Sequence, residues 1–254
     1  MLEINKIYNM DCLEGMEYID DKSIDMILCD LPYGVTKNKW DSIISLEKLW
    51  NQYRRIIKEN GAIVLTAQQP FTTSLIMSNQ EEFRYSLVWD KIGTTGFQNA
   101  KKMPLRRHED ILIFYKKLPN YNPQMETRGK PRKKGGSKVD NGCYGELRSK
   151  ESFNNEYYPT SIIAISNAVK IGKIHPTQKP VALFEYLIKT YTNENELVLD
   201  NCMGSGTTAI ACINTNRNYI GFELNKEYYE IAKNRINKHI LDNNLQDKYN
   251  LITY

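Results

Sequence analysis

The sequence is poor in metal-holding residues and in long apolar runs. It has three histidines and five cysteines in 254 residues, and no two cysteines show the CxxC spacing typical of zinc and redox sites. Neither a disulfide framework nor a zinc centre is therefore expected. The apolar runs, such as residues 61–67, stay far short of the roughly 18 residues that cross a bilayer. No basic stretch leads into an apolar one within residues 1–6, so we expect no export, no membrane association and a cytoplasmic location.

The overall composition is that of an ordinary globular protein, but its charge is unevenly distributed. With 41% hydrophobic and 25% charged residues, the chain fits none of the collagen-like, disordered or coiled-coil classes. Its length predicts one large domain, or one domain that carries a small lobe. The net charge of +4 is too small to name a partner. Residues 116–138, however, hold eight basic side chains against one acidic one, a local charge of +7, which leaves −3 for the rest of the chain.

Short apolar runs alternate with helical patterns along the chain. The runs that predict buried strands are 24–29, 61–66, 85–89, 111–115, 197–199 and 219–222. A period of 3.6 residues predicts a helix over 46–57, with Ser45 as N-cap and Asn60-Gly61 as its end. Two later helices are expected to begin at Pro180 and after an Asn225 cap. This alternation indicates an α/β fold with a mostly parallel sheet. From 118 to 173 no period survives, which predicts an inserted lobe or a long loop.

A glycine-rich turn near the end of the chain is typical of nucleotide-binding sites. Residues 197–209 are predicted to form a strand, a turn with Gly204 and Gly206, and the start of a helix. Glu223 follows Gly204 by 19 residues, where a carboxylate can accept hydrogen bonds from both hydroxyls of a ribose. The spacing matches the fingerprint of nicotinamide dehydrogenases but fits a second kind of cofactor equally well. An isolated motif of this type is also explained by an ordinary turn between a strand and a helix.

The position of this turn argues against a dehydrogenase. After Gly206 only 48 residues remain, enough for one more strand and two helices but not for a whole doubly wound sheet. The N-terminal strands must therefore complete the sheet, which predicts a circularly permuted order of its parts.

The segment Asp30-Leu31-Pro32-Tyr33-Gly34 follows the predicted strand 24–29, at the end where open α/β sheets bind ligands. Taken alone, it is a turn with an exposed acid. Its chemistry also suits methylation of an exocyclic amine, whose lone pair is delocalised into the base until acceptors hold the amine hydrogens. The Asp30 carboxylate and the Leu31 carbonyl would be these acceptors. Pro32 would keep Leu31 extended, and Tyr33 would stack on an extruded base.

These motifs resemble those of the amino-directed DNA methyltransferases in the permuted arrangement called the beta class, in which the catalytic motif precedes the cofactor motif. The resemblance covers nearly the whole chain. Residues 30–33 resemble the family's Asp-Pro-Pro-Tyr motif, with Leu31 in place of a proline. Residues 200–208 resemble its glycine motif for S-adenosylmethionine, with Asn201 and Cys202 in place of the usual proline and an aromatic or small residue.

The resemblance implies a fold and its division along the chain. The expected fold is a doubly wound, mostly parallel, Rossmann-like methyltransferase sheet in circularly permuted order, with an inserted basic lobe. Residues 1–117 would form the catalytic half of the sheet, 118–173 an inserted target-recognition region, and 174–254 the half that binds S-adenosylmethionine.

Further segments resemble family elements around the cofactor. Residues 175–180, before a predicted helix, are similar to the segment that holds the amino-acid end of the cofactor, where Lys179 and free backbone amides would attract its carboxylate. Taken alone, this segment is a proline-framed helix entry with a solvated lysine. Residues 9–12 resemble an element near the cofactor adenine, where Asp11 would accept from the exocyclic amine, although a short acidic turn explains them equally. Residues 89–91 and 107–109 also resemble family segments and are interpreted as structural.

The resemblance yields a candidate residue set. The catalytic residues would be Asp30, Leu31, Pro32 and Tyr33. The cofactor-binding residues would be Asp11, Cys12, His175, Thr177, Lys179, Asp200, Cys202, Gly204, Gly206, Thr207 and Glu223. The DNA-binding residues would be Arg128, Lys130, Arg132, Lys133, Lys134 and Lys138, which lie where the family inserts its target-recognition segment and would neutralise phosphates. Methyl transfer needs no metal.

The sequence therefore predicts an enzyme that flips adenine out of double-stranded DNA and methylates its N6 with S-adenosylmethionine. Methylation of cytosine N4 is the nearest alternative, because the same loop chemistry serves either amine. A nicotinamide-dependent oxidoreductase and a non-catalytic DNA-binding protein are more distant alternatives. A homodimer and a cognate restriction endonuclease as partner are left open.

Overall fold

The computed structural model describes residues 2–34, 43–136, 138–140, 146–148, 150–167 and 178–252. The chain divides into two compact units, one formed by residues 1–122 and 161–254 and the other by residues 123–160. None of the helices among the described residues has both the length and the apolar composition needed to cross a membrane.

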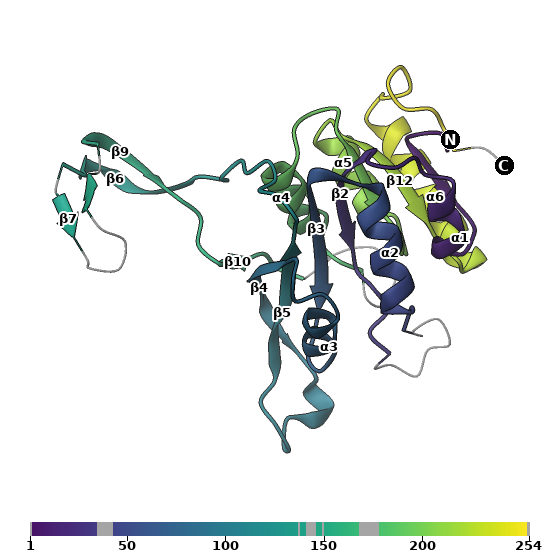
Figure 1. Cartoon of the computed structure of the whole chain (residues 1–254), viewed down its shortest axis with the longest axis horizontal. Helices are drawn as coiled ribbons and strands as arrows, with labels where there is room; N and C mark the ends of the chain where they lie inside the picture. Colours follow the sequence, from purple (N-terminus) through teal and green to yellow (C-terminus); the bar gives the residue numbers. More distant parts are fainter. Residues whose placement is uncertain are drawn as a thin grey trace. The chain divides into compact units, whose positions relative to one another are not determined.

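An eight-stranded sheet forms the centre of the large unit (Figure 1). Its strands, in spatial order, are β1 (Lys6–Tyr8), β12 (Asn218–Phe222), β11 (Leu197–Asp200), β2 (Ile24–Cys29), β3 (Ile57–Ala67), β5 (Arg106–Phe114), β4 (Phe83–Thr95) and β10 (Ile162–Ala164). All neighbours pair in parallel except β5, which runs antiparallel to both β3 and β4. The expected mostly parallel α/β sheet is therefore confirmed.

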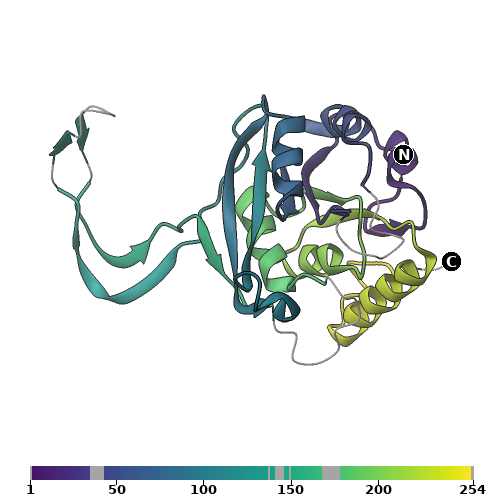
Figure 2. The same cartoon turned by 90° about the horizontal axis from the view of Figure 1, so that it is seen from below.

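Helices cover both faces of the sheet (Figure 2). The helices of the large unit are α1 (Cys12–Glu17), α2 (Leu46–Ile56), α3 (Phe71–Ser78), α4 (Val181–Tyr191), α5 (Thr207–Asn214) and α6 (Lys226–Asp242), with a short 3-10 helix η1 (Phe97–Asn99). Side chains alternate along β2, so that Met26 and Leu28 pack with α4 and α5 while Ile27 and Cys29 pack with α1 and α2. The apolar strand runs in the sequence arise because both faces are buried.

The order of the strands reflects the permutation expected from the sequence. The β11 strand, near the C-terminus, lies between β12 and β2, and pairs in parallel with β2 through Val198–Met26 and Leu199–Ile27. The late glycine segment thus completes a sheet that the N-terminal strands begin.

Some element boundaries differ from the predicted ones. The predicted helix 46–57 ends at Ile56, and β3 begins at Ile57, so Asn60-Gly61 lies inside a strand rather than at a helix end. Ser45 precedes α2 but makes no side-chain cap. Asn225, in contrast, caps α6 as predicted by accepting the amides of Glu227 and Tyr228 at 2.9 and 3.2 Å. The short β1, α1, α3 and β10 gave no recognised pattern, because each is too short to show a period.

The small unit consists of two antiparallel strand pairs. The first joins β6 (Glu126–Lys134) to β9 (Ser152–Tyr157), and the second joins β7 (Lys138–Asp140) to β8 (Glu146–Arg148). The region without periodicity is thus an inserted lobe built of strands. It is shorter than the expected 118–173, because residues 118–122 and the edge strand β10 belong to the large unit. We propose residues 123–160 as the inserted target-recognition region.

Tight packing of α1 on the sheet gives a stability prediction. A Cβ added at Gly15 would lie 2.4 Å from the buried ring of Phe222, closer than a side chain can tolerate. Alanine normally stabilises a helix interior relative to glycine. Here the overlap with Phe222 should outweigh that gain, so Gly15→Ala should lower the free energy of unfolding by about 1–3 kcal/mol. Urea unfolding measures this. Gly93→Ala, whose nearest neighbour is 3.9 Å away, is the matched control. Equal stability of the Gly15→Ala variant and the wild type would contradict the packing.

Candidate active site

A cavity of about 880 Å³ lies where several parallel strands end. Asp30 follows β2, Gly204 follows β11 and Glu223 follows β12, and all three residues line the cavity. Because β2, β11 and β12 are adjacent and parallel, the loops at their carboxyl ends meet at one edge of the sheet. The candidate catalytic acid and the glycine turn therefore face one space, as a shared site requires.

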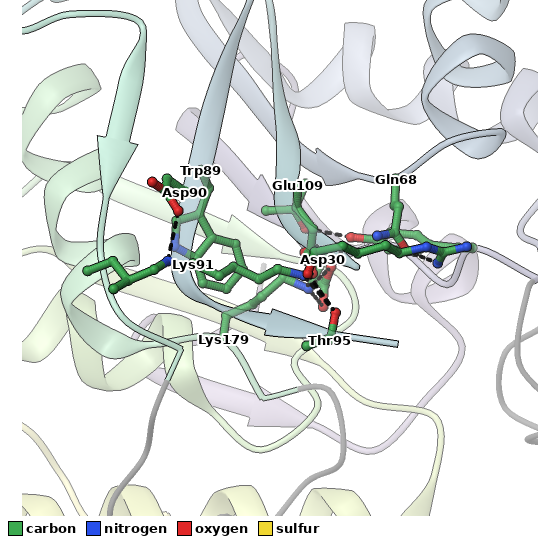
Figure 3. A network of polar contacts seen from close by, with 12 residues as sticks. Asp30, Gln68, Trp89, Asp90, Lys91, Thr95, Glu109 and Lys179 are labelled. Carbon is green, nitrogen blue, oxygen red and sulfur yellow. Dashed lines mark hydrogen bonds and ion pairs between the residues drawn. The ribbon is translucent and has the colours of Figure 1, made fainter. Parts of the chain in front are cut away.

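The carboxylate of Asp30 is held by three side chains. The Lys179 ammonium donates to Asp30 Oδ1 at 2.8 Å and to Oδ2 at 2.7 Å (Figure 3). The hydroxyls of Tyr33 and Thr66 donate to Oδ1 at 2.7 and 2.5 Å. Oδ1 therefore accepts three hydrogen bonds, whereas the contacts of the described residues give Oδ2 one. A carboxylate oxygen has two lone pairs, so Oδ2 retains an acceptor position.

The Lys179 ammonium lies on carboxylates rather than free in the cavity. It contacts Glu109 at 3.2 Å in addition to Asp30. Its side chain is 7% exposed, and the two carboxylates outweigh the effect of burial, so the pKa of Lys179 is raised. The ammonium group thus stays charged and fixes the orientation of Asp30, a role that differs from the expected hold on a cofactor carboxylate.

A second lysine completes the network. The buried Lys91 ammonium contacts the other oxygen of Glu109 at 3.2 Å and lies 3.4 Å from Thr95 (Figure 3). Two cations and two carboxylates alternate, so the group is formally neutral. Segments 89–91 and 107–109, which the sequence indicates to be structural, contribute Trp89, Lys91 and Glu109 to the lining of the cavity. The pairing of β4 with β5, which sets Trp89 opposite Glu109, brings them together.

Asp90 and Arg107, in the same two segments, pair with each other: Arg107 donates two hydrogen bonds of 2.8 Å to the Asp90 carboxylate. Trp89, besides lining the cavity, donates its indole N–H to the Ile165 carbonyl at 2.8 Å. The Arg107 guanidinium lowers the pKa of Asp90 below its usual range.

The remaining residues of the candidate catalytic loop serve as its support. Leu31 is buried in the core formed with α1 and α2, which explains an apolar side chain in place of the family's proline. Pro32 lines the cavity. The Tyr33 ring stacks on Phe71 with 5.4 Å between centroids and 25° between planes, so one face of this ring is already covered.

The glycine turn is organised by Glu223. The Glu223 carboxylate accepts the Gly204 amide on Oε2 and the Asn225 amide on Oε1, both at 2.8 Å. Gly204 has φ of 54°, a left-handed conformation that glycine adopts without strain. Gly206 also has a positive φ, but a Cβ there would meet Ala232 and Ile236 at 3.2–3.3 Å. Gly206 therefore allows close packing against α6 and is absent from the residues found to line the cavity.

Buried polar contacts explain the two unusual residues of the glycine motif. Asn201 accepts a hydrogen bond of 2.5 Å from the buried hydroxyl of Tyr53, which ties the turn to α2. Cys202 lines the cavity and lies beside the thiols of Cys12 and Cys29. Burial raises the pKa of Cys29 to about 12, so this thiol stays protonated. A proline at 201 would have no acceptor for Tyr53.

Other predicted cofactor residues also reach the cavity. Asp11 is the N-cap of α1 and accepts the Leu13 and Glu14 amides on Oδ1, and both Asp11 and the buried Cys12 line the cavity. Thr207 lines the cavity as well, and its hydroxyl accepts a hydrogen bond of 3.1 Å from the guanidinium of Arg235. Arg235 is not among the residues predicted from the sequence. His175 and Thr177 lie outside the described residues.

The predicted DNA-binding residues lie in the small unit, mostly on β6. Arg128, Arg132 and Lys134 surround the ring of Tyr157 at 5.4, 5.6 and 3.5 Å from its centroid. Arg128 also contacts Glu126, and Lys133 contacts Glu151 at 3.0 Å. Lys130 is exposed, and Lys138 is in β7. Residues 123–160 hold eight basic and five acidic side chains, so the net charge of the unit is +3, smaller than the basic run alone indicated.

Comparisons of sequence and of structure match this chain to DNA methyltransferases. The sequence model of a family described as DNA methylase matches residues 24–234. Type II methyltransferase M1.MboII of Moraxella bovis is 29% identical, over 94% of this chain and 98% of its own. DNA adenine methyltransferase YhdJ of Escherichia coli K12 is 26% identical, over 92% and 83%. The crystal structure of an M1.HpyAVI–SAM complex matches with a TM-score of 0.64 and 28% identity, over 91% of this chain and 98% of that one.

Burial of Asp200 predicts a pH-dependent stability. Its carboxylate accepts the Cys202 amide at 3.0 Å and the Thr208 hydroxyl, but burial raises its pKa from 3.8 to about 6. Because the folded chain binds this proton more tightly than the unfolded chain, stability from this group is fully present below about pH 4. It falls as the pH rises to about 6, by up to about 3 kcal/mol.

Urea unfolding of the wild type and Asp200→Asn from pH 4 to 7 measures this. The wild type should lose stability relative to the variant as the pH rises. A difference between the two that stays constant with pH would contradict the assignment.

Proposed function

Because the chain belongs to the DNA methylase family of N6- and N4-amino methyltransferases, we propose that it methylates N6 of adenine in double-stranded DNA. DNA amino-methyltransferase activity and S-adenosylmethionine as cofactor follow from that membership. The nicotinamide oxidoreductase alternative is thereby excluded. The finer assignment to adenine rests on the acid at position 30 and on relatives such as the adenine methyltransferase YhdJ. The Type II names among the relatives also support a cognate restriction endonuclease as a partner.

The residues of the cavity fit S-adenosylmethionine. Each Glu223 oxygen accepts one backbone amide and keeps a lone pair for a ribose hydroxyl. The Asp11 cap contacts use only Oδ1, so Oδ2 is available to the amine of an adenine. When bound, S-adenosylmethionine supplies an electrophilic methyl group. We propose Glu223, Asp11 and the backbone at Gly204 as its main contacts.

One observation carries the mechanism: Asp30, Gly204 and Glu223 line the same cavity. We propose that Oδ2 of Asp30 and the carbonyl of Leu31 accept the hydrogens of the target amine. Holding both hydrogens directs the nitrogen lone pair at the donor and fixes the nucleophile for in-line attack. The fixed carboxylate also stabilises the positive charge that develops on nitrogen. The nitrogen then gives up one of the two held protons through Oδ2 of Asp30, which leaves a neutral methylated amine, and no strong base is needed for this. Tyr33, Thr66 and Lys179 keep the carboxylate in place.

We propose that phosphates are contacted by the basic side chains of the small unit. Phosphate contacts provide affinity and orientation without reading sequence. The guanidinium groups of Arg128 and Arg132 lie over the Tyr157 ring, and this contact restricts two flexible side chains, which lowers the entropy cost of binding.

Nucleoside analysis after incubation with DNA and labelled cofactor tests the proposed reaction. The wild type should produce N6-methyladenine. Asp30→Ala should lower kcat by more than roughly 10³-fold, because an essential charge is lost from a preorganised site. Binding of S-adenosylhomocysteine, measured by thermal shift, should be nearly unchanged, because the side-chain contacts of Asp30 are to Tyr33, Thr66 and Lys179 and not to Glu223, Asp11 or Gly204, the proposed main cofactor contacts.

The matched control is Asp20→Ala, which removes an exposed acid outside the cavity and should keep its activity. Labelled N4-methylcytosine would refute the adenine assignment while preserving the reaction class. Near-normal turnover by Asp30→Ala would refute the catalytic role of this carboxylate.

Neutralising the basic strand should weaken DNA binding. The triple variant Arg132→Gln, Lys133→Gln and Lys134→Gln should bind duplexes of any sequence less tightly, and the slope of log K against log salt should fall by up to about 0.9 per lost phosphate contact. Fluorescence anisotropy at several salt concentrations measures both quantities. Lys48→Gln, which changes an exposed lysine of α2, is the control. An unchanged affinity and slope would show that these side chains do not contact phosphate.

A further inference from the structure

The β4–β5 hairpin continues past the sheet as a projecting arm, residues 91–106. Figure 1 shows it extending beyond the ends of β2 and β3. Regular pairing stops after Asp90–His108 and resumes once, at Thr95–Arg106. The tip is nevertheless ordered by its own hydrogen bonds: Gly96 has φ of 85°, Asn99 donates its amide to the Gly96 carbonyl at 2.9 Å, and Lys102 donates to Asn99 at 2.8 Å. The arm is thus a defined turn that presents fixed side chains.

The arm forms one wall of the cavity. Its residues that line the cavity are Lys91, Thr95, Gly96, Asn99, Met103, Pro104 and Arg106. Arg106 is tied to Gln68 at 2.8 Å, and Gln68 also lines the cavity. A base held near Asp30 therefore has this arm beside it, and the nucleotides on either side of that base must pass close to the tip.

The surface of the arm combines positive charge with exposed apolar side chains. Residues 92–106 carry Lys101, Lys102 and Arg106 and contain no aspartate or glutamate. Phe97 is 83% exposed, and Ile92, Met103 and Leu105 are also exposed. An aromatic ring at the very tip of a turn buries nothing in this protein, and its exposure to water is unfavourable.

We propose that this arm is a second DNA contact and that Phe97 enters the duplex where the flipped base has left the stack. This inference rests on the proposed function, since it requires a base from duplex DNA in the cavity. Extruding a base costs stacking and pairing energy, and apolar side chains inserted between base steps are a known way to offset it. Lys101 and Lys102 follow Phe97 by four and five residues on the same arm and contact phosphates near the gap.

The charge of the arm selects DNA over a protein partner as the occupant of this surface. Cations without any compensating acid complement a phosphate backbone. Phe97 itself does not line the cavity, but it directly follows Gly96, which does.

Methylation of two duplexes separates this role from a structural one. The position that the wild type modifies is mapped first, and both duplexes carry the target base at that position. In the first duplex the target base is paired. In the second duplex the target base faces an abasic position. Phe97→Ala should lower kcat/KM on the paired duplex by about tenfold or more, because the gap in the stack is left unfilled. On the abasic duplex, where extrusion costs little, the variant should be within about twofold of the wild type. Phe97→Trp, which keeps a flat apolar ring, should retain activity on both.

Tyr18→Ala is the matched control, since Tyr18 is an exposed aromatic residue outside the cavity; it should leave both rates unchanged. Equal rates of Phe97→Ala and wild type on the paired duplex would overturn the inference, and so would an equal loss on both duplexes. A wild type that methylates neither duplex would instead refute the proposed function.

Discussion

Asp30 and Lys179 lie 149 residues apart in the chain, and their buried ion pair joins the two halves of the cavity. Asp30 comes from the end of β2, Lys179 from the segment before α4, and Glu109 from β5. Burying a charge away from water is costly unless the charge is paired. Removing one partner of a buried pair typically lowers the free energy of unfolding by several kcal/mol. The alternation of Lys91, Glu109, Lys179 and Asp30 therefore holds the position of β4, β5 and the α4 entry relative to the loop after β2.

The same network prepares the site for chemistry. A carboxylate that must hold an amine in one direction gains from having its own orientation fixed beforehand, because no reorganisation is then needed as charge develops. Tyr33, Thr66 and Lys179 all donate to Oδ1, whereas Oδ2 accepts only from Lys179 among the described residues and keeps an acceptor position. Both oxygens are thus held in place, and Oδ2 is the one we propose for the target amine.

Two parts of the chain offer positive charge to a nucleic acid, and they differ in kind. The small unit has paired cations, several of them in contact with acids or with Tyr157, and we propose that it provides general affinity. The arm of residues 91–106 has few cations, no acid between 92 and 106, and an exposed ring at Phe97, next in the chain to Gly96, which lines the cavity. A long basic run in a sequence draws attention to the first, whereas the second is recognised only when the cavity is seen.

The sequence by itself determined the fold class, the permuted order and the two central motifs. The buried strands 24–29 and 197–200 were predictable because apolar runs end at polar, glycine-rich segments, and Asn225 was predictable as a cap because capping is a local interaction. What it could not determine was the partner of Lys179, the place of Glu109 and Lys91 in the cavity, or the packing role of Gly206. These depend on which strands become neighbours: pairing of β4 with β5 and of β2 with β11 joins residues that no local period relates. Local interactions leave a signature in sequence, but long-range ion pairs form only after tertiary packing has excluded water from them.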